Sequence, residues 1–417
     1  MRISTSLMYG RGLSTMGSQQ SDLLHLFQQV GSGRRIITPA DDPLGAAKSI
    51  NLRQTDAVNA RYGANRDIAA QNLGLEDNAL DSVMRTLQDV KTRLVEAGNG
   101  TYSDAERRTL ADVLRHAYED LFTQANATDG NGQYLFSGYT GDTPAYVKDG
   151  AGAAVWNGST GDRNVQVDQT RRMSTSDIGL DIFGRATPGS SAYLTSAADG
   201  NTGNGIIKSP SISDVNGANV GNNFEITFSG DASDPANPLV YEVAVTDSDG
   251  NPVETQGPFP YVDGSAIDMG GVQVLIEGDP LAGDTFTVET AQSADMNVFD
   301  TLDSLIATLE QPADGDPQAM AEVVNKLASA MQKIDINHDN VLTVRASVGA
   351  RLNEIEALDA NGEMRGLSYK DQVSKLEDVD YYQAISSLQL RQMALQAATS
   401  AFQTIQVTTS LFSSGRR

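Results

Sequence analysis

The side chains that most often carry out chemistry are scarce in this 417-residue sequence, which contains no Cys and only three His. The absence of Cys excludes disulfides, thiolate nucleophiles and zinc-thiolate or iron-sulfur sites. His25, His116 and His338 stand apart, and neither a His-Glu-x-x-His zinc motif, a phosphate-binding Gly-x-x-x-x-Gly-Lys-Ser/Thr loop nor a Gly-x-Ser-x-Gly nucleophile turn occurs. The sequence therefore predicts a protein that is not an enzyme, with no catalytic residue, no cofactor and no metal.

Two acidic segments have the residue types that bind calcium. Residues 335–340 alternate Asp or Asn with other residues, as a helix-loop-helix calcium loop does, but position six of the loop is Asn340 instead of Gly and position twelve is Ala346 instead of Glu. We therefore expect helix there. Residues 247–251 contain two Asp and one Asn, which turns use to satisfy their own backbone. We favour a turn, with calcium binding as the alternative.

The chain is strongly acidic. It has 30 Lys and Arg against 54 Asp and Glu, a formal charge of -24, which repels phosphate backbones and anionic lipid headgroups. We therefore expect no nucleic-acid partner and no membrane partner. The N-terminus lacks the apolar core of a cleaved signal peptide. The segment from Asn201 to Asp295 contains one basic residue, Lys208, and fifteen acidic ones. This composition favours a solvated module in the middle of the chain.

Both ends of the chain have the periodicity of helices with a narrow apolar seam. In the first, apolar residues recur every seven positions, and Gly31 and Gly33 end the helix. The last stretch, residues 371–412, contains no Gly or Pro and predicts one unbroken helix roughly 60 Å long. The seam residues are Met16, Leu23, Phe27 and Val30 in the first helix and Ile385, Leu388, Leu395, Phe402 and Ile405 in the last.

Further helices adjoin these ends, and strands occupy the middle. One helix is predicted from Pro43 to Gly98, and another after Ser103, whose spacing to Glu106 is that of a capping box. Helix returns near Asp295. Between these regions, short alternations of apolar and polar residues predict strands. They lie at residues 134–138, 165–167, 224–228, 241–245 and 272–276.

Residues 32–47 read as a turn between two helices. Thr38 or Asp41 is expected to cap the second helix, with Pro43 in its first turn, where a missing N–H costs nothing. The turn also carries Arg34 and Arg35 in an otherwise acidic chain. We expect this cationic pair to hold neighbouring acidic subunits in register.

Several segments resemble a known family. Ser32–Ala47 resembles the N-terminal signature of the bacterial flagellins and their relatives. Met1–Thr5, Gly132–Gly138, Val344–Asn353 and the tail Leu376–Phe412 resemble more closely the hook-associated proteins of the flagellin family that join the flagellar hook to the filament.

The resemblance implies an α+β fold, an elongated rod of long N- and C-terminal helices forming a helical bundle or coiled coil, with an inserted outer all-β region. We accordingly expect residues 1–45 with 371–417 to be terminal coiled-coil assembly segments and residues 46–138 with 295–370 to form a helical rod domain. The outer β-domain is then 139–294, within which 139–190 and 200–292 read as two submodules.

The resemblance also implies a structural adaptor between hook and filament that polymerises through its terminal helices. It implies export through the flagellar type III apparatus without a cleaved signal peptide and an extracellular location in the flagellum. The implied partners are neighbouring copies of the chain, the other hook-filament junction protein, flagellin and an export chaperone. Two alternatives stay open, namely flagellin itself and an adhesin or ligand-binding role for the inserted β-module.

A narrow seam cannot bury itself in a lone monomer, so we expect the ends to fold only as neighbouring subunits cover them. Folding and assembly would then be one event. The residues predicted to make subunit contacts are Leu7, Met16, Leu23, Phe27, Val30, Arg34, Arg35, Ile385, Leu388, Leu395, Phe402 and Ile405.

Overall fold

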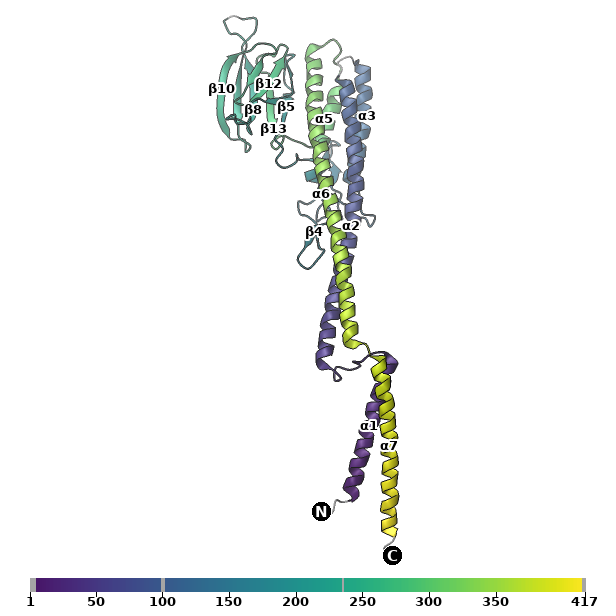
Figure 1. Ribbon diagram of the computed structural model, residues 1–417. Coiled ribbons are helices and arrows are strands. Elements are labelled where there is room, and N and C mark those ends of the chain that lie inside the picture. Colours follow the sequence, from purple (N-terminus) through teal and green to yellow (C-terminus); the bar gives the residue numbers. More distant parts are fainter. Residues whose placement is uncertain (1–4, 99–101, 235, 415–417) are drawn as a thin grey trace. The chain divides into compact units, whose positions relative to one another are not determined.

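The computed structural model describes residues 5–98, 102–234 and 236–414, so Met1–Ser4 of the opening segment lie outside it. The chain forms two compact units, unit 1 with residues 1–64 and 357–417 and unit 2 with residues 65–356. The division expected from the sequence lies instead at 45/46 and 370/371. Two long helices, α2 (Pro43–Ala97) and α6 (Pro317–Glu377), continue through all of these positions, so composition marks no boundary there (Figure 1).

Unit 1 consists of α1 (Thr5–Ser32), α7 (Tyr381–Ser414), the beginning of α2 and the end of α6. Long terminal helices are thus confirmed, but the prediction of one unbroken helix over 371–412 is wrong. Helix α6 ends at Glu377 and α7 begins at Tyr381 because Asp380 caps the new helix, its Oδ1 accepting the Tyr382 N–H at 3.0 Å.

Unit 2 contains α3 (Asp104–Ala125), the short α4 (Gly179–Phe183) and α5 (Val298–Glu310), together with the adjoining parts of α2 and α6. The capping pattern ahead of α3 is confirmed, since the Ser103 N–H donates to Glu106 Oε2 at 2.8 Å. Phe299 lies at the centre of the aromatic core. Its ring centroid is 5.5 Å from that of Tyr118 and 4.9 Å from that of Tyr146.

The strands of unit 2 belong to two hairpins and two larger antiparallel sheets. Strands β1 and β2 form one hairpin and β3 and β4 the other, while the five-stranded sheet has the order β10-β9-β8-β13-β5 and the second sheet pairs β12 with β11, β6 and β7. The strands are β1 (Tyr146–Lys148), β2 (Ala154–Trp156), β3 (Asn164–Gln166), β4 (Arg172–Ser174), β5 (Tyr193–Ala197), β6 (Ile206–Ile207), β7 (Ser211–Ile212), β8 (Asn223–Ser229), β9 (Val240–Thr246), β10 (Pro252–Pro260), β11 (Ala266–Asp268), β12 (Val272–Glu277) and β13 (Thr285–Thr290).

The two larger sheets share one apolar core, as the alternation in the sequence predicts. Phe224, Ile226 and Phe228 of β8 point into it together with Val274 of β12, and all four are buried. Phe224 pairs with Val245 across the β8–β9 register, which sets inward and outward faces for both strands. The α+β class, with long helices at both ends and strands between them, is confirmed.

Three shorter expectations have different outcomes. Residues 134–138 are not a strand, because Gly138 adopts φ +65° in a turn where an added Cβ would meet the Ser159 carbonyl oxygen. Residues 335–340 lie inside α6, as expected. Asp247 closes the turn between β9 and β10, because its Oδ1 accepts the Asn251 N–H at 2.8 Å. This is the turn that we favoured from the sequence.

Across the described residues, no helix has the length and apolar character to cross a membrane.

The inserted sheets are tied to α6 by amide side chains. Asn325 of α6 is buried, accepts the Ile207 N–H at 3.0 Å and donates to the Gly205 carbonyl at 2.9 Å. Gln332, two turns further along, accepts the Thr195 N–H at 3.0 Å. A side-chain amide can serve both a donor and an acceptor at a strand end, so these two residues fix the sheets on the helix.

Candidate assembly surface

The terminal helices α1 and α7 lie against each other (Figure 1). Near the ends of the chain, Tyr9 and Phe402 meet edge to face with ring centroids 5.3 Å apart. Gly12 permits this approach, because a Cβ there would lie 3.1 Å from the Phe402 ring. Further along, Arg391 of α7 donates to the Asp22 carboxylate of α1.

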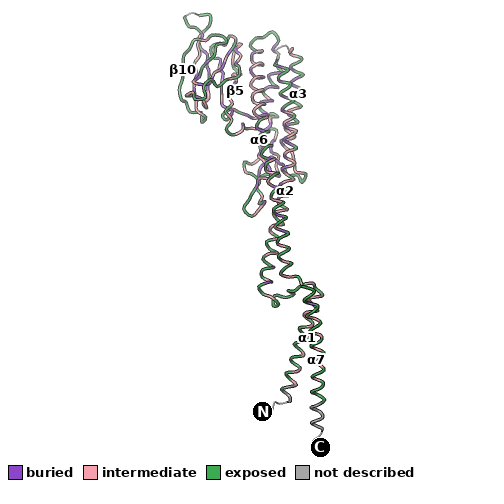
Figure 2. The backbone as a smooth tube through the Cα atoms, in the orientation of Figure 1, coloured by how far each residue is buried: buried purple, intermediate pink, exposed green. Residues whose placement is uncertain are grey.

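This pair has almost no core of its own, as the tube of Figure 2 shows for α1 and α7. Within the described part of the two helices, Ala384 is the only buried side chain. A folded domain is held together mainly by buried apolar surface, so two helices with one buried alanine gain little stability from each other.

The predicted contact residues divide into two groups on this pair. The residues that repeat every seven positions are half-buried, whereas four others are exposed, with 53% of Leu7, 47% of Phe27, 45% of Ile385 and 43% of Ile405 accessible. These four side chains present apolar surface on the outside of the pair. The half-buried group comprises Met16, Leu23, Val30, Leu388, Leu395 and Phe402.

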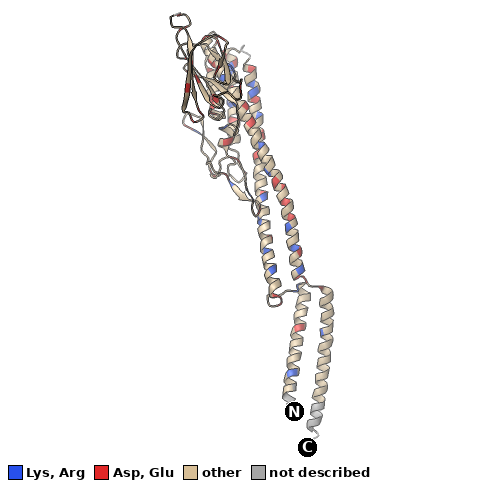
Figure 3. Cartoon of the chain, turned by 60° about the vertical axis from the view of Figure 1, so that its left-hand side comes forward, with Lys and Arg blue, Asp and Glu red and all other residues tan. Residues whose placement is uncertain are grey.

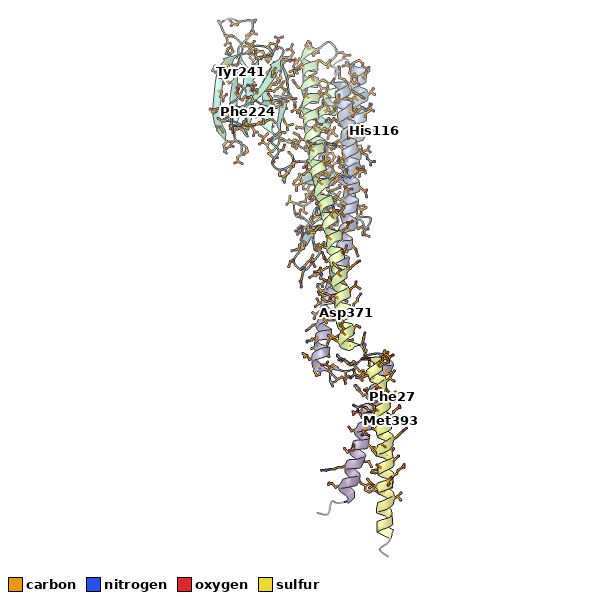
Figure 4. All side chains as sticks on the ribbon, in the orientation of Figure 1. Phe27, His116, Phe224, Tyr241, Asp371 and Met393 are labelled. Carbon is orange, nitrogen blue, oxygen red and sulfur yellow. The ribbon has the colours of Figure 1, made fainter. Side chains whose placement is uncertain are left out.

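The sequence analysis missed further exposed apolar residues on α1 and α7. Met393, labelled with Phe27 in Figure 4, is 57% exposed, and Tyr382 is 92% exposed. A single seven-residue stripe could not reveal them, because they lie on other faces of the helices. A count of all large apolar residues in these two terminal segments would have found them. The others are Leu13, Leu24, Tyr381, Leu390 and Val407.

The turn between α1 and α2 is joined by backbone hydrogen bonds to the break between α6 and α7. The Arg35 N–H donates to the Glu377 carbonyl at 2.6 Å, and the Val379 N–H donates to the Gly33 carbonyl at 3.0 Å. Arg34 and Asp378 form an isolated antiparallel bridge. We call residues 33–42 and 376–380 the elbow of unit 1.

The Glu377 side chain organises this elbow. Its carboxylate accepts hydrogen bonds from the buried Ser49 hydroxyl and from Arg53, and the Arg34 guanidinium lies 3.8 Å away. Burial opposes ionisation of Glu377, but these donors and positive charges outweigh it, and the pKa of the carboxyl lies below its ordinary value. The sequence analysis did not single out Glu377, which no motif distinguishes.

The two arginines predicted to contact neighbouring subunits therefore have partners in their own chain. Arg34 lies beside Glu377, and Arg35 donates to the Leu376 carbonyl at 2.6 Å. Both side chains are still about half exposed, at 54% and 51%. Contact with another subunit stays a prediction.

The adjacent carboxylates of Asp41 and Asp42, at the start of α2, accept hydrogen bonds from different backbone N–H groups. Asp41 accepts the Thr38 N–H at 2.8 Å and the Ile37 N–H at 3.0 Å, and the Thr38 bond is the main reason that the pKa of Asp41 is lowered. Asp42 accepts the Gly45 N–H at 2.9 Å. The helix cap is thus Asp42, not Thr38 or Asp41, while Pro43 stands in the first turn as predicted.

The His, Asp and Glu side chains are the possible metal ligands of this chain, which has no Cys. The described residues contain no group of three or more His, Asp or Glu that could hold a metal ion. His25 lies 3.5 Å from Asp41, and His338 lies on α6 next to Asp339. The arrangement is suited to holding helices and presenting apolar side chains.

Known proteins of the bacterial flagellum are similar to this chain. Residues 3–140 match the bacterial flagellin N-terminal helical region. Flagellar hook-associated protein 3 of Salmonella typhimurium is 28% identical over 406 residues, which cover 97% of each chain. Flagellin B of Helicobacter pylori is 29% identical over 137 residues, which cover 33% of this chain and 27% of that protein.

A solved structure agrees with these sequence matches. The crystal structure of flagellar hook-associated protein 3 from Legionella pneumophila has a TM-score of 0.67 and 26% identity, and the match covers 78% of this chain and 98% of that one. The resemblance stated from the sequence is thereby confirmed: this chain is similar to flagellar hook-associated protein 3 along almost its whole length, and its residues 3–140 match the N-terminal helical region of the bacterial flagellins.

Proposed function

We propose that this protein is a structural subunit of the bacterial flagellum that joins the hook to the filament. The similarity to flagellar hook-associated protein 3 over 97% of the chain is the observation that carries this proposal. Flagellin itself is less well supported, because the Helicobacter pylori flagellin match covers only a third of the chain. No catalytic step is part of the proposed role.

The terminal pair α1 and α7 is the part that we expect to polymerise. It exposes large apolar side chains that a stable monomer would bury, such as Phe27 and Ile385. Exposed apolar surface of this kind is typical of sites that other proteins cover. Neighbouring copies, the other hook-filament junction protein and flagellin are the proposed partners.

An export chaperone and passage through the flagellar type III apparatus belong to the same proposal. An apolar surface that is covered only after assembly needs protection beforehand, which a chaperone on α1 or α7 would provide. The chain has no Cys, so no disulfide can form before the subunit reaches its place.

Separate deletion of residues 1–31 and 381–417 tests the proposal, since both deletions leave the elbow in place. Each truncated chain is assayed for binding to isolated hooks and for nucleation of flagellin polymerisation there. Trp156 is the single Trp and lies in unit 2, so its fluorescence reports whether unit 2 stays folded. We expect unit 2 to melt normally and both assembly activities to be lost.

Point variants separate the surface from the mere presence of the helices. Ile385→Asp places a charge on the exposed seam of α7, and Val215→Asp places the same charge at a 75% exposed position of unit 2. We expect the first variant to lose hook binding and the second to keep it. Equal binding by both variants would contradict assembly through α7.

A further inference from the structure

The described residues of unit 2 include two buried acidic side chains, Glu76 of α2 and Asp284 of the turn before β13. Other acidic residues lie along the helices of this unit in Figure 3. The carboxylate of Asp284 is surrounded by backbone donors, since its Oδ1 accepts the Thr202 N–H at 2.7 Å and its Oδ2 accepts the Leu281 N–H at 2.8 Å. Backbone donors of this kind keep a buried carboxylate ionised.

Glu76 lacks such a set of donors. Its side chain is 0% exposed, and its Oε1 accepts the N–H of Asp177 at 3.0 Å. Its Oε2 has no hydrogen-bond partner in the part of the chain that the structure describes. An ionised Glu76 would therefore hold a charged oxygen with neither water nor a donor beside it, which opposes ionisation. Glu76 keeps its proton while it is buried.

The charged groups that face Glu76 come from two other segments. Asp177 lies between β4 and α4, and Arg351 lies on α6. The Arg351 guanidinium donates to the Asp177 carboxylate, which neutralises its positive charge. On α2 itself, the adjacent Asp77 forms an ion pair with Arg345 of α6 at 2.9 Å. Both arginines thus already have carboxylate partners, and neither compensates a negative charge on Glu76.

The backbone that Glu76 binds belongs to residues 174–179, which we call the latch segment. This segment connects the β3–β4 hairpin to α4. Helix α2 holds it through the bond from the Asp177 N–H to Glu76, and α6 holds it through Arg351, which also donates to the Ser174 carbonyl at 3.3 Å. The bond to Glu76 is therefore one of a small number of contacts that keep the segment closed.

The chain on each side of the latch segment is held by groups that do not titrate near neutral pH. Before it, the Arg66 guanidinium donates to the Val167 carbonyl at 2.9 Å. After it, the Asn340 amide donates to the Ile182 carbonyl at 3.1 Å. These contacts stay in place when Glu76 changes its charge, so an opening that depends on Glu76 is confined to the segment.

We propose that the latch segment opens from α2 in response to pH, because protonated Glu76 binds it and an ionised, hydrated Glu76 releases it. Burial raises the pKa of Glu76 in the closed form, whereas an exposed Glu titrates near about 4.3. The stabilisation of the closed form is therefore complete below about pH 4 and is lost as pH rises through the closed-form pKa, since opening releases one proton. This property concerns unit 2 alone and does not depend on the proposed function.

Hydrogen exchange of the Asp177 amide in the full-length chain tests the latch segment, because this amide donates to Glu76. Between about pH 5 and about pH 8 we expect its protection, relative to an unfolded amide, to fall by up to about tenfold per pH unit, the limit for release of one proton. The Thr195 amide is the internal control. It donates to the neutral Gln332 side chain at 3.0 Å, so its protection should stay constant.

Two variants identify the titrating group. Glu76→Gln is neutral at every pH, so the protection of the Asp177 amide should no longer depend on pH. Asp177→Asn leaves Arg351 without its carboxylate, which favours ionised Glu76, so the fall in protection should persist but level off at a lower pH. Trp156 fluorescence is a second readout, because a Cβ at Gly179 would lie 3.0 Å from its ring. Its emission should shift with pH in the wild-type chain and not in Glu76→Gln.

Several results would overturn the proposal. Constant protection of the Asp177 amide in the wild-type chain would mean that Glu76 does not control the segment, and an equal fall in Glu76→Gln would assign the titration to another group. Loss of the pH dependence in Asp177→Asn would place the proton on Asp177 instead. A parallel fall at the Asp177 and Thr195 amides would mean that unit 2 opens as a whole. Binding to isolated hooks, which tests the proposed function, is a separate measurement.

Discussion

The Glu377 carboxylate can be tested as the centre of the elbow by the substitution Glu377→Ala. The Ser49 hydroxyl, which is 1% exposed, would lose its acceptor, and an unsatisfied buried polar group costs about 1–3 kcal/mol. Arg53 and Arg34 are 50% and 54% exposed, so their lost ion pairs add only about 0–1 kcal/mol each. We expect the local opening free energy of the elbow to fall by about 2 kcal/mol, which is about 30-fold in the opening equilibrium.

Hydrogen exchange of the Arg35 and Val379 amides measures this opening, since both donate backbone hydrogen bonds across the elbow. The control is Asp371→Asn, which removes the exposed Asp371–Lys375 pair from the same helix and should change exchange less than about threefold. Glu377→Gln keeps an acceptor for the Ser49 hydroxyl, so its exchange rates should lie between those of Glu377→Ala and Asp371→Asn. Equal exchange in Glu377→Ala and Asp371→Asn would refute the reasoning and would leave the backbone bonds alone as the cause of the elbow's stability.

Other predictions concern pH and packing. Because the pKa of Glu377 is lowered, its stabilisation is present above its unfolded pKa and is lost as pH falls through the folded pKa, so the protection of the elbow amides relative to unfolded amides should fall below about pH 4. Burial, with Asp177 beside it, raises the pKa of Glu76 well above its ordinary value, so its stabilisation is present below the unfolded pKa and is lost as pH rises through the folded one. Glu76→Gln should therefore stabilise unit 2 at pH 7 by about 1–3 kcal/mol in urea unfolding followed by Trp156 fluorescence, and the gain should vanish near pH 4. Gly138→Ala should destabilise unit 2 by about 2 kcal/mol or more, since its Cβ would lie 2.4 Å from the Ser159 carbonyl oxygen. Gly130→Ala, at a φ of +80° with no atom nearby, should cost less, and equal melting temperatures would contradict the steric reason.

Much of the architecture could be predicted because its signals are local. The alternation of Phe224, Ile226 and Phe228 with polar residues requires a strand with one buried face, and the structure has it. Pro43 and the Ser103–Glu106 pattern mark the starts of α2 and α3 for the same reason. These features depend on residues within one or two turns of each other.

The elbow could not be predicted, because it depends on residues far apart in the sequence. Asp380 and Asp378 were not recognised as a helix break, since Asp is common in helices and the break is needed only where Arg34 bridges to Asp378. Thr38 or Asp41 was the expected cap, and the three-dimensional turn selects Asp42 instead. Glu377 is one of 54 acidic residues in the sequence, and only the folded chain places Ser49 and Arg53 beside it.

The described side chains of the terminal pair include a single buried alanine, which has a consequence for how mutations in this protein can be measured. Substitutions in α1 and α7 remove little buried surface from an isolated chain, so they should barely change its melting temperature. A screen of thermal stability would therefore class these helices as tolerant of mutation. In the proposed assembly the constraint on their residues comes from other molecules, and only a selection that requires assembly, such as swimming through soft agar, would reveal it.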